Sequence, residues 1–273
     1  MIKHAIVSAA AGILTGVLGA AAAFAQTEPL RDLCVDRPGK DTPPCIVDKG
    51  HVLVETGAFL YSRDHETDTS EYEFGETLLR FGVTDTAELQ FGWTPYSVVR
   101  LRDESTGRRR TLKGVGDLTG AVKVNFRNPD GSGTSVAAQA FVTAPTGSNG
   151  IGAGAWEGGF IVPIAFELSD KIGLTLDPEI DVRGNESSGG HHLAYAGTVS
   201  LSRDLGSGVE GSAEIWSMVD HDPAGHTTEA SFDVSLAWAP EKRSNLQFDV
   251  ELDLGLTRQT PDLVAAGGIA YRF

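Results

Sequence analysis

The chain has 273 residues, of which 33 are glycine and 41% are hydrophobic, and its formal net charge is −15 at pH 7. This length suffices for one large domain. The acidic balance excludes nucleic acid as a partner, because nucleic-acid binding needs a basic face.

The N-terminus has the three parts of a secretory signal peptide. Lys3 and His4 supply positive charge, residues 5–22 are apolar and small, and Ala23-Phe24-Ala25 is an A-x-A cleavage site before Gln26. Residues 1–25 are therefore predicted to be removed by cleavage near Ala25/Gln26 rather than kept as an anchor. No later stretch reaches the ~18 uninterrupted apolar residues of a spanning helix, so a membrane location requires a β-barrel.

Residues 26–50 form a segment rich in proline that contains both cysteines, Cys34 and Cys45. In an oxidising compartment, two cysteines this close are expected to form a local disulfide. A metal site is disfavoured, because the segment offers few further ligands. We predict a periplasmic N-terminal arm that precedes the main domain.

Residues 51–273 contain about twelve runs with period-2 alternation or β-rich composition, separated by Gly, Pro, Asp and Asn. Their length, about 10 to 14 residues, matches tilted membrane strands. We therefore predict an all-β fold, a transmembrane antiparallel up-and-down β-barrel of about twelve strands. The runs are 51–61, 72–83, 86–99, 115–127, 134–144, 155–168, 171–183, 192–203, 208–219, 227–239, 245–258 and 262–273.

The connections between these runs alternate in length. Short turns on one side and long loops on the other describe a barrel with both termini in the periplasm. Pro163 and Pro178 interrupt the strand pattern and predict bulges or strand ends. The tight turns are 84–85, 128–133, 169–170, 205–207 and 240–243, and the longer connections are 62–71, 100–114, 145–154, 184–191 and 220–226, with a shorter last one at 258–261.

Charged residues share one face of several runs. A soluble sandwich strand could show the same alternation, but the consecutive acids opposite the apolar residues of 246–256 suit a wet lumen. These charges could line a conduction path or fill the interior with salt bridges and water, and both interpretations stay open. The lumen-lining candidates are Asp117, Lys123, Arg127, Asp177, Glu179, Asp181, Arg183, Glu210, Glu214, Asp249, Glu251 and Asp253; Arg80, Glu88, Glu167, Asp233 and Arg272 share their parity.

The last strand ends on an aromatic residue, with Ile269, Tyr271 and Phe273 on one face. This ending resembles the C-terminal signal by which the barrel-assembly machinery recognises outer-membrane barrels. We expect it to pair with the run 51–61 and close the barrel. Aromatic residues near both ends of the other runs predict two interfacial girdles.

Two short motifs carry a family resemblance. Residues 115–123, Val-Gly-Asp-Leu-Thr-Gly-Ala-Val-Lys, and residues 140–147, Ala-Phe-Val-Thr-Ala-Pro-Thr-Gly, resemble the GD…K and PTG segments of the outer-membrane family named for the MetA pathway of phenol degradation. The resemblance covers about 51–273. It implies an outer-membrane barrel of a Gram-negative bacterium that passes aromatic or other small apolar compounds.

The sequence thus predicts a passive outer-membrane channel or transporter for a small hydrophobic or aromatic solute, without catalytic residues, cofactor or metal. One alternative is a rim-active lipid or ester hydrolase, and others are a non-conducting structural barrel and a soluble periplasmic sandwich. Loop histidines raise the hydrolase alternative and also a loop metal site. The residues concerned are His191, His192 and His221 with Ser187, Ser188 and Ser217, and, for a metal, also Asp220, Asp222 and His226.

A basic run, Arg108-Arg109-Arg110 with Arg100, Arg102 and Lys113, stands out in this acidic chain. Anionic lipopolysaccharide around the outer rim is a fitting partner, and a solvated loop is an equally good interpretation. The other expected partners are outer-membrane lipid, the barrel-assembly machinery and the small-molecule solute. The oligomeric state stays open.

Overall fold

All elements in this computed structural model are β-strands, and the structure describes residues 30–102, 106–187, 189–240 and 245–273. The predicted signal peptide and its cleavage site lie outside the described residues. Within them, no helix has the length and apolar character needed to cross a bilayer. The strands are β1 (Val52–Asp64), β2 (Thr69–Phe74), β3 (Glu76–Thr84), β4 (Ala87–Trp93), β5 (Tyr96–Arg102), β6 (Arg109–Gly114), β7 (Leu118–Arg127), β8 (Thr134–Ala144), β9 (Glu157–Ile161), β10 (Ile164–Ser169), β11 (Ile172–Gly184), β12 (His191–Gly206), β13 (Val209–Asp220), β14 (Thr227–Trp238), β15 (Leu246–Gly255) and β16 (Leu263–Arg272).

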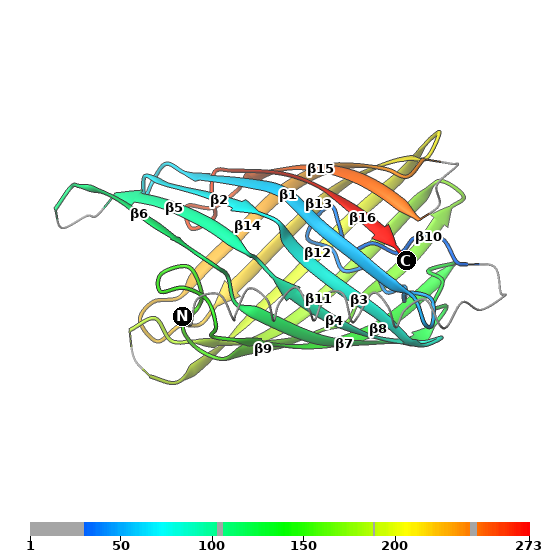
Figure 1. The fold of residues 1–273 in the computed structure, drawn as a ribbon, viewed down its shortest axis with the longest axis horizontal. Coiled ribbons are helices and arrows are strands. Elements are labelled where there is room, and N and C mark those ends of the chain that lie inside the picture. The colour runs from blue at the N-terminus through cyan, green and yellow to red at the C-terminus, as the bar shows by residue number, and fades with distance from the viewer. Residues whose placement is uncertain (1–29, 103–105, 188, 241–244) are drawn as a thin grey trace, which may run out of the picture.

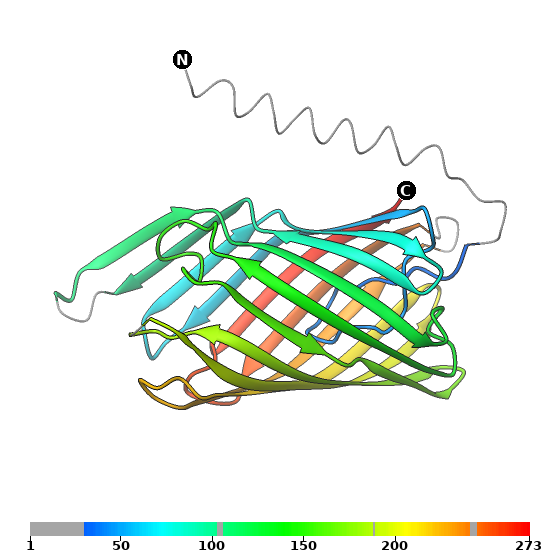
Figure 2. The ribbon, with the colours of Figure 1, turned by 90° about the horizontal axis from the view of Figure 1, so that it is seen from below.

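The sheet closes on itself as an antiparallel barrel of twelve strands (Figures 1 and 2). Strands β9 and β10 are two halves of one wall strand, and both pair with β8 and β11. The barrel closes where β16 pairs with β1, from Leu53 opposite Arg272 to Arg63 opposite Leu263. The predicted all-β barrel and the predicted pairing of the last strand with the first are both confirmed.

Side-chain burial is inverted relative to a soluble protein. Alternate residues that point inward are polar and buried, such as Arg80, Glu88 and Lys123, whereas those that point outward are large and apolar, such as Val250. A barrel wall with lipid outside and a polar interior requires this arrangement. Near the short turns the outer face carries ring pairs, including Trp238 with Phe248 at 5.8 Å between centroids and Tyr271 with Phe273 at 4.7 Å.

Two of the expected long loops are instead strands. Residues 62–71 and 100–114 were predicted as loops, but β1 extends to Asp64, β2 begins at Thr69, β5 ends at Arg102 and β6 begins at Arg109. Backbone pairing continues into both segments, since Asp64 of β1 pairs with Thr69 of β2 and Arg102 of β5 pairs with Arg109 of β6. Strands β2, β5 and β6 therefore prolong the wall strands beyond the barrel. The resulting sheet extension projects past the rim at the end of the long loops, here called the loop end (Figure 1).

The two prolines behave differently from each other. Pro163 does interrupt the wall strand, because β9 ends at Ile161 and β10 begins at Ile164. The bulge or strand end predicted at Pro178 is wrong, since β11 continues through this residue, paired with Gly197. The Val162 N–H donates to the Pro178 carbonyl at 3.0 Å, so the Pro178 ring nitrogen faces the same gap beside Pro163. The missing donor of Pro178 therefore falls where the neighbouring strand is already broken.

Candidate functional site

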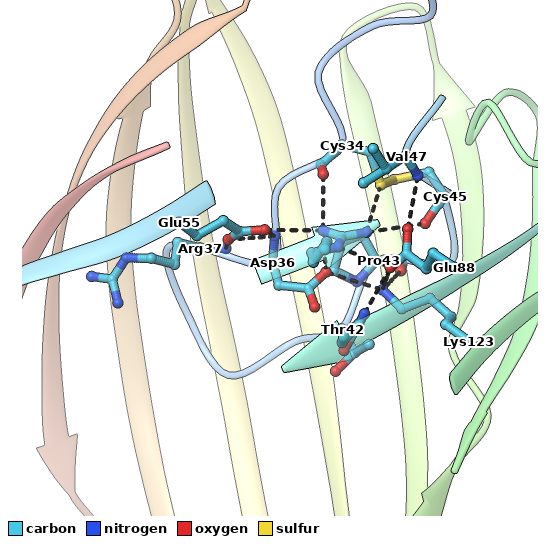
Figure 3. Close-up of polar contacts among 12 residues, drawn as sticks. Cys34, Asp36, Arg37, Thr42, Pro43, Cys45, Val47, Glu55, Glu88 and Lys123 are labelled. Atoms are coloured by element: carbon cyan, nitrogen blue, oxygen red, sulfur yellow. Dashed lines mark hydrogen bonds and ion pairs between the residues drawn. A yellow bond between two sulfur atoms is a disulfide. The ribbon is translucent and has the colours of Figure 1, made fainter. Parts of the chain in front are cut away.

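The arm lies inside the barrel, whereas the sequence predicted only a periplasmic segment that precedes the main domain. Residues 30–50 enter at the end of the short turns, here called the turn end, and cross the lumen (Figure 3). Cys34 and Cys45 form a disulfide with sulfur atoms 2.05 Å apart. The arm contacts inward side chains of β1, β3, β4, β7, β11 and β13 to β16.

A buried ion cluster holds one side of the arm (Figure 3). The Arg80 guanidinium lies 2.7 Å from Asp36, 3.1 Å from Glu55 and 2.8 Å from Glu88, and it donates to the Cys34 carbonyl at 2.9 Å. The Lys123 ammonium lies 3.0 Å from the same Asp36 carboxylate. We call these residues the Arg80 cluster: Arg80, Lys123, Asp36, Glu55 and Glu88.

Backbone groups of the arm complete the Arg80 cluster. The Glu55 carboxylate accepts the N–H groups of Asp36 at 3.0 Å and Arg37 at 3.1 Å, and Glu88 accepts the N–H of Val47 at 2.8 Å. Charged groups away from bulk water are stable only when they are paired and hydrogen-bonded. The arm therefore supplies hydrogen bonds to the buried carboxylates and, in Asp36, a carboxylate that contacts both cations.

Basic residues of the arm face the acids of the opposite wall. Arg37 lies 3.1 Å from Asp249, and the Lys40 ammonium contacts Asp253 and lies 3.4 Å from Asp233. The arm N–H groups continue this pattern, since Gly39 donates to Glu251 at 3.2 Å. The acids of β15 that the sequence placed in a wet lumen are thus partners of the arm.

The turn end of the arm has an apolar seat. Val47 packs with Leu53 of β1 and Ala270 of β16, and Leu33 and Val35 cover this small core. Beside it, Arg272 of β16 lies 2.8 Å from Asp48. This small apolar core and the ion pairs together hold the arm in place across the barrel.

Asp41 gives arm docking a dependence on pH. Burial raises its pKa well above the ordinary value of 3.8, and the neighbouring carboxylates of Glu214 and Asp177 raise it further. The docked arm therefore holds this proton more tightly than a released arm does. The contribution of Asp41 to docking is therefore largest at low pH and is lost as pH rises from 3.8 through the raised pKa.

We expect Asp41→Asn to strengthen docking at pH 8 and to flatten its pH dependence, because the amide carries no charge to desolvate. The readout is amide exchange of Thr42, whose N–H donates to Asp177 at 3.0 Å, corrected for intrinsic exchange rates. Protection of Thr42 in the parent protein should fall between pH 5 and pH 8. Equal slopes in the parent and the variant would contradict the assignment.

Above the arm, toward the loop end, the lumen contains a cavity of about 760 Å³. Arm residues 36–40 form part of its lining, and inward residues of the wall form the rest. Its lining includes the rings of Phe141 of β8, Trp216 of β13 and Trp93 of β4, and the Lys40 ammonium lies 5.9 Å from the Trp216 ring. Carboxylates dominate its polar lining: Glu71, Glu73, Glu76, Asp117, Glu179, Glu229, Glu251 and Asp253.

The two motifs of the family resemblance meet at one edge of this cavity. Asp117 accepts the N–H groups of Gly147 at 2.6 Å and Ala153 at 2.7 Å, and the Leu118 N–H donates to the Thr146 hydroxyl at 3.0 Å. A Cβ atom on Gly147 would lie 2.8 Å from the Asp117 carboxylate, closer than real Cβ atoms approach. The GD and PTG segments thus fold the connection 145–156 against β7.

Asp117→Asn is expected to loosen this connection, because an amide offers one acceptor oxygen where the carboxylate offers two. Loss of one hydrogen bond to a charged acceptor predicts about tenfold to hundredfold faster amide exchange at Gly147 or Ala153. Hydrogen exchange with mass spectrometry measures this. The exchange of peptides from β12 serves as the internal control, and unchanged exchange in 145–156 contradicts the role.

The other lumen candidates lie at four places along the lumen. Asp177 and Glu214 bind arm N–H groups, whereas Glu179 lines the cavity. Toward the loop end Arg183 lies 2.8 Å from Asp220, and Asp181 is buried. Glu210 lies at a second cavity, of about 710 Å³, near the turn end.

Arg127 is on the other side of the wall. A register shift between Asn125 and Arg127 opposes it to Val136, which alternates with the inward residues Ser135 and Ala137. Its side chain is exposed. The bulge therefore turns Arg127 away from the lumen, which strict alternation along β7 did not anticipate.

The ring nitrogens of His191 and His192 contact groups other than a serine hydroxyl. One ring nitrogen of His192 lies 2.7 Å from Asp220 and the other contacts Asn185 at 2.9 Å, whereas His191 contacts the Trp156 carbonyl at 2.8 Å. The Ser217 hydroxyl donates to a backbone carbonyl at 3.0 Å, and Ser188 lies outside the described residues. No group of three or more metal-ligating side chains is assembled in the part of the chain that the structure describes.

Most of the residues that sequence reasoning missed belong to the arm. Asp36, Arg37 and Lys40 carry its main ion pairs, and Glu55 of β1 was not among the candidates. A usable signal existed in the sequence, because the arm mixes basic and acidic residues while the predicted lumen face is mainly acidic. No local pattern connects the two, since Lys40 and Asp253 are 213 positions apart.

Solved structures with a similar fold include an outer membrane channel, a porin and the transport unit of an autotransporter. An outer membrane channel from Pseudomonas putida F1 matches with a TM-score of 0.60 at 14% identity, over 82% of this chain and 94% of that one. The NanC porin matches with a TM-score of 0.53 at 8% identity, over 81% and 98%. The transport unit of the autotransporter AIDA-I from Escherichia coli matches with a TM-score of 0.52 at 9% identity, over 82% and 90%. These likenesses show the fold.

The sequence comparison defines the family. None of the curated proteins matches this chain. A family profile described as "Putative MetA-pathway of phenol degradation" matches residues 35–273, which includes most of the arm and the whole barrel. The profile covers well over half of the chain, and the protein therefore belongs to this family.

Proposed function

We propose that the protein is a passive outer-membrane channel for a small aromatic or otherwise hydrophobic compound, with the arm as the element that controls passage. The observation that carries the proposal is the cavity of about 760 Å³ inside the barrel, bounded toward the turn end by the arm. Its volume lies in the range of ligand sites, about 300 to 1,000 Å³. The outer-membrane location and signal-peptide cleavage near Ala25/Gln26 are part of this proposal.

The lining of the cavity supports an aromatic solute that is neutral or cationic. The inward rings of Phe141 and Trp216 offer stacking surfaces, and the surrounding carboxylates repel anions. Weak contacts of this kind suit passive transfer, because a solute must be able to leave as well as enter. No energy source is needed for such a channel.

The aromatic end of β16 supports assembly in the same membrane. Ile269, Tyr271 and Phe273 point outward and are 37%, 42% and 50% exposed, and the Phe273 N–H donates to the Val52 carbonyl at 2.8 Å. These residues form the closing seam of the barrel. We propose that they are the assembly signal read by the barrel-assembly machinery.

Solute uptake by liposomes tests the function. Proteoliposomes should swell faster with phenyl glucoside than with glucose. Protein-free liposomes should not swell measurably with either solute. Phe141→Ala with Trp216→Ala should slow the aromatic solute about threefold to tenfold, given the usual contribution of a ring contact. Trp238→Ala is the matched control, because this ring is 47% exposed on the outer face. Uptake equal to that of empty liposomes would indicate a structural barrel instead.

A further inference from the structure

The sheet extension at the loop end continues the two faces of the barrel. Its inner face carries Glu71 and Ser62, which line the cavity. Its outer face carries Tyr61 and Tyr72, which oppose each other across β1 and β2. The outer face of the extension is therefore the prolongation of the barrel's lipid-facing surface beyond the rim (Figure 1).

Aromatic rings lie where this outer face leaves the barrel. The rings of Tyr61 and Tyr72 are 5.2 Å apart, and those of Phe74 and Tyr96 are 6.2 Å apart. Phe59 of β1 is 45% exposed beside them. Such rings collect at the level where hydrocarbon meets the headgroups.

Cations follow directly beyond these rings on the same face. The strand register aligns Arg63, Ser70 and Arg100 in one row, and Arg102 opposes Arg109 in the next. The Arg100 guanidinium lies 5.1 Å from the Tyr72 ring centroid. We name five residues the outer basic face: Arg63, Arg100, Arg102, Arg109 and Lys113.

The outer basic face is positively charged, whereas the protein as a whole is acidic. The formal net charge of the chain is −15, yet residues 100–113 contain six Lys and Arg and two acids, Asp103 and Glu104, which lie outside the described residues. On the outer basic face, Asp68 lies 2.8 Å from Arg63 and 3.9 Å from Arg109. One carboxylate thus faces two of the five cations, and the face keeps a positive excess.

We propose that the outer basic face binds the phosphate groups of lipopolysaccharide in the surrounding membrane. The inference rests on the outer-membrane location in the proposed function, in which the loop end faces outward. Rings at the interface and cations one row further out match the order of acyl chains and phosphates in that lipid. Arginine suits this partner, because its planar fork binds phosphate oxygens in pairs.

Binding of hexa-acyl lipid A to the purified full-length barrel in neutral detergent tests the proposal. The variant is Arg100→Gln/Arg102→Gln. The matched control is Arg110→Gln/Arg203→Gln, because Arg110 lies in the same extension on the inner parity and Arg203 lies near the turn end. Both double variants remove two positive charges, so a difference between them reports position rather than net charge.

The outer variant should bind bis-phosphorylated lipid A about 30-fold more weakly, since each cation near an anionic lipid surface contributes about fivefold. The control should bind like the parent, and dephosphorylated lipid A should bind all three proteins equally weakly. Equal losses in both variants, unchanged binding in the outer variant, or equal affinity for the dephosphorylated lipid would each overturn the proposal. Lipid A binding is measured without solute passage. Its result therefore tests the lipopolysaccharide proposal separately from the channel function, which liposome uptake tests.

Discussion

Deletion of residues 26–50 behind the intact signal segment is expected to raise single-channel conductance by at least about tenfold. The arm crosses the lumen between the cavities near the loop end and the turn end, and its ion pairs reach both Arg80 on one wall and Asp253 on the other. Removing it leaves a water-filled barrel of twelve strands. Planar-bilayer recording of the parent and the deleted protein measures the difference.

The deleted barrel keeps enough internal partners to fold. Arg80 still lies 3.1 Å from Glu55 and 2.8 Å from Glu88, and the wall ladders do not involve the arm. Heat-modifiable migration on detergent gels checks folding before any recording. A second variant, Cys34→Ser/Cys45→Ser, retains the arm but not its disulfide and should show an intermediate, fluctuating conductance. A folded, deleted barrel with the parent's conductance would exclude the arm as the element that controls passage.

Arg80→Gln is expected to destabilise the barrel strongly. Its side chain is fully buried, and the change leaves the carboxylates of Asp36, Glu55 and Glu88 with only Lys123 as a nearby cation. Breaking a buried ion network by removing one partner costs about 3 to 5 kcal/mol. The temperature at which the compact form converts to the unfolded form on detergent gels should therefore fall clearly.

Two comparisons distinguish the loss of the Arg80 cluster from the loss of one positive charge elsewhere. Arg203→Gln removes an exposed arginine of β12 and should leave the transition within about 0.5 kcal/mol of the parent. In the arm-deleted barrel the cost of Arg80→Gln should shrink, because water then reaches Glu55 and Glu88. A cost that is the same with and without the arm would contradict the cluster as the arm's anchor.

The wall of the barrel could be predicted from sequence because its pattern is local. Alternation along 246–256 assigned Asp249, Glu251 and Asp253 to the inside, and short turns set the antiparallel order. The predicted side-chain faces and strand ends were wrong where backbone pairing departed from simple alternation and turn rules. The bulge at Arg127 reversed a face, and Pro178 stayed in register beside a gap in the next strand. The segments 62–71 and 100–114 form paired strand ends although they carry almost no apolar residues.

The sequence by itself determined that this protein is a barrel with apolar side chains outside and polar side chains inside. Period-2 alternation of apolar and charged residues gives each strand only one face that can contact lipid. It also brought Cys34 and Cys45 close enough to pair. Only the tertiary structure decided that the arm lies inside the lumen. That placement depends on charge complementarity between residues far apart in the chain, such as Asp36 with Arg80 and Lys40 with Asp253, and such pairs leave no mark in any local pattern.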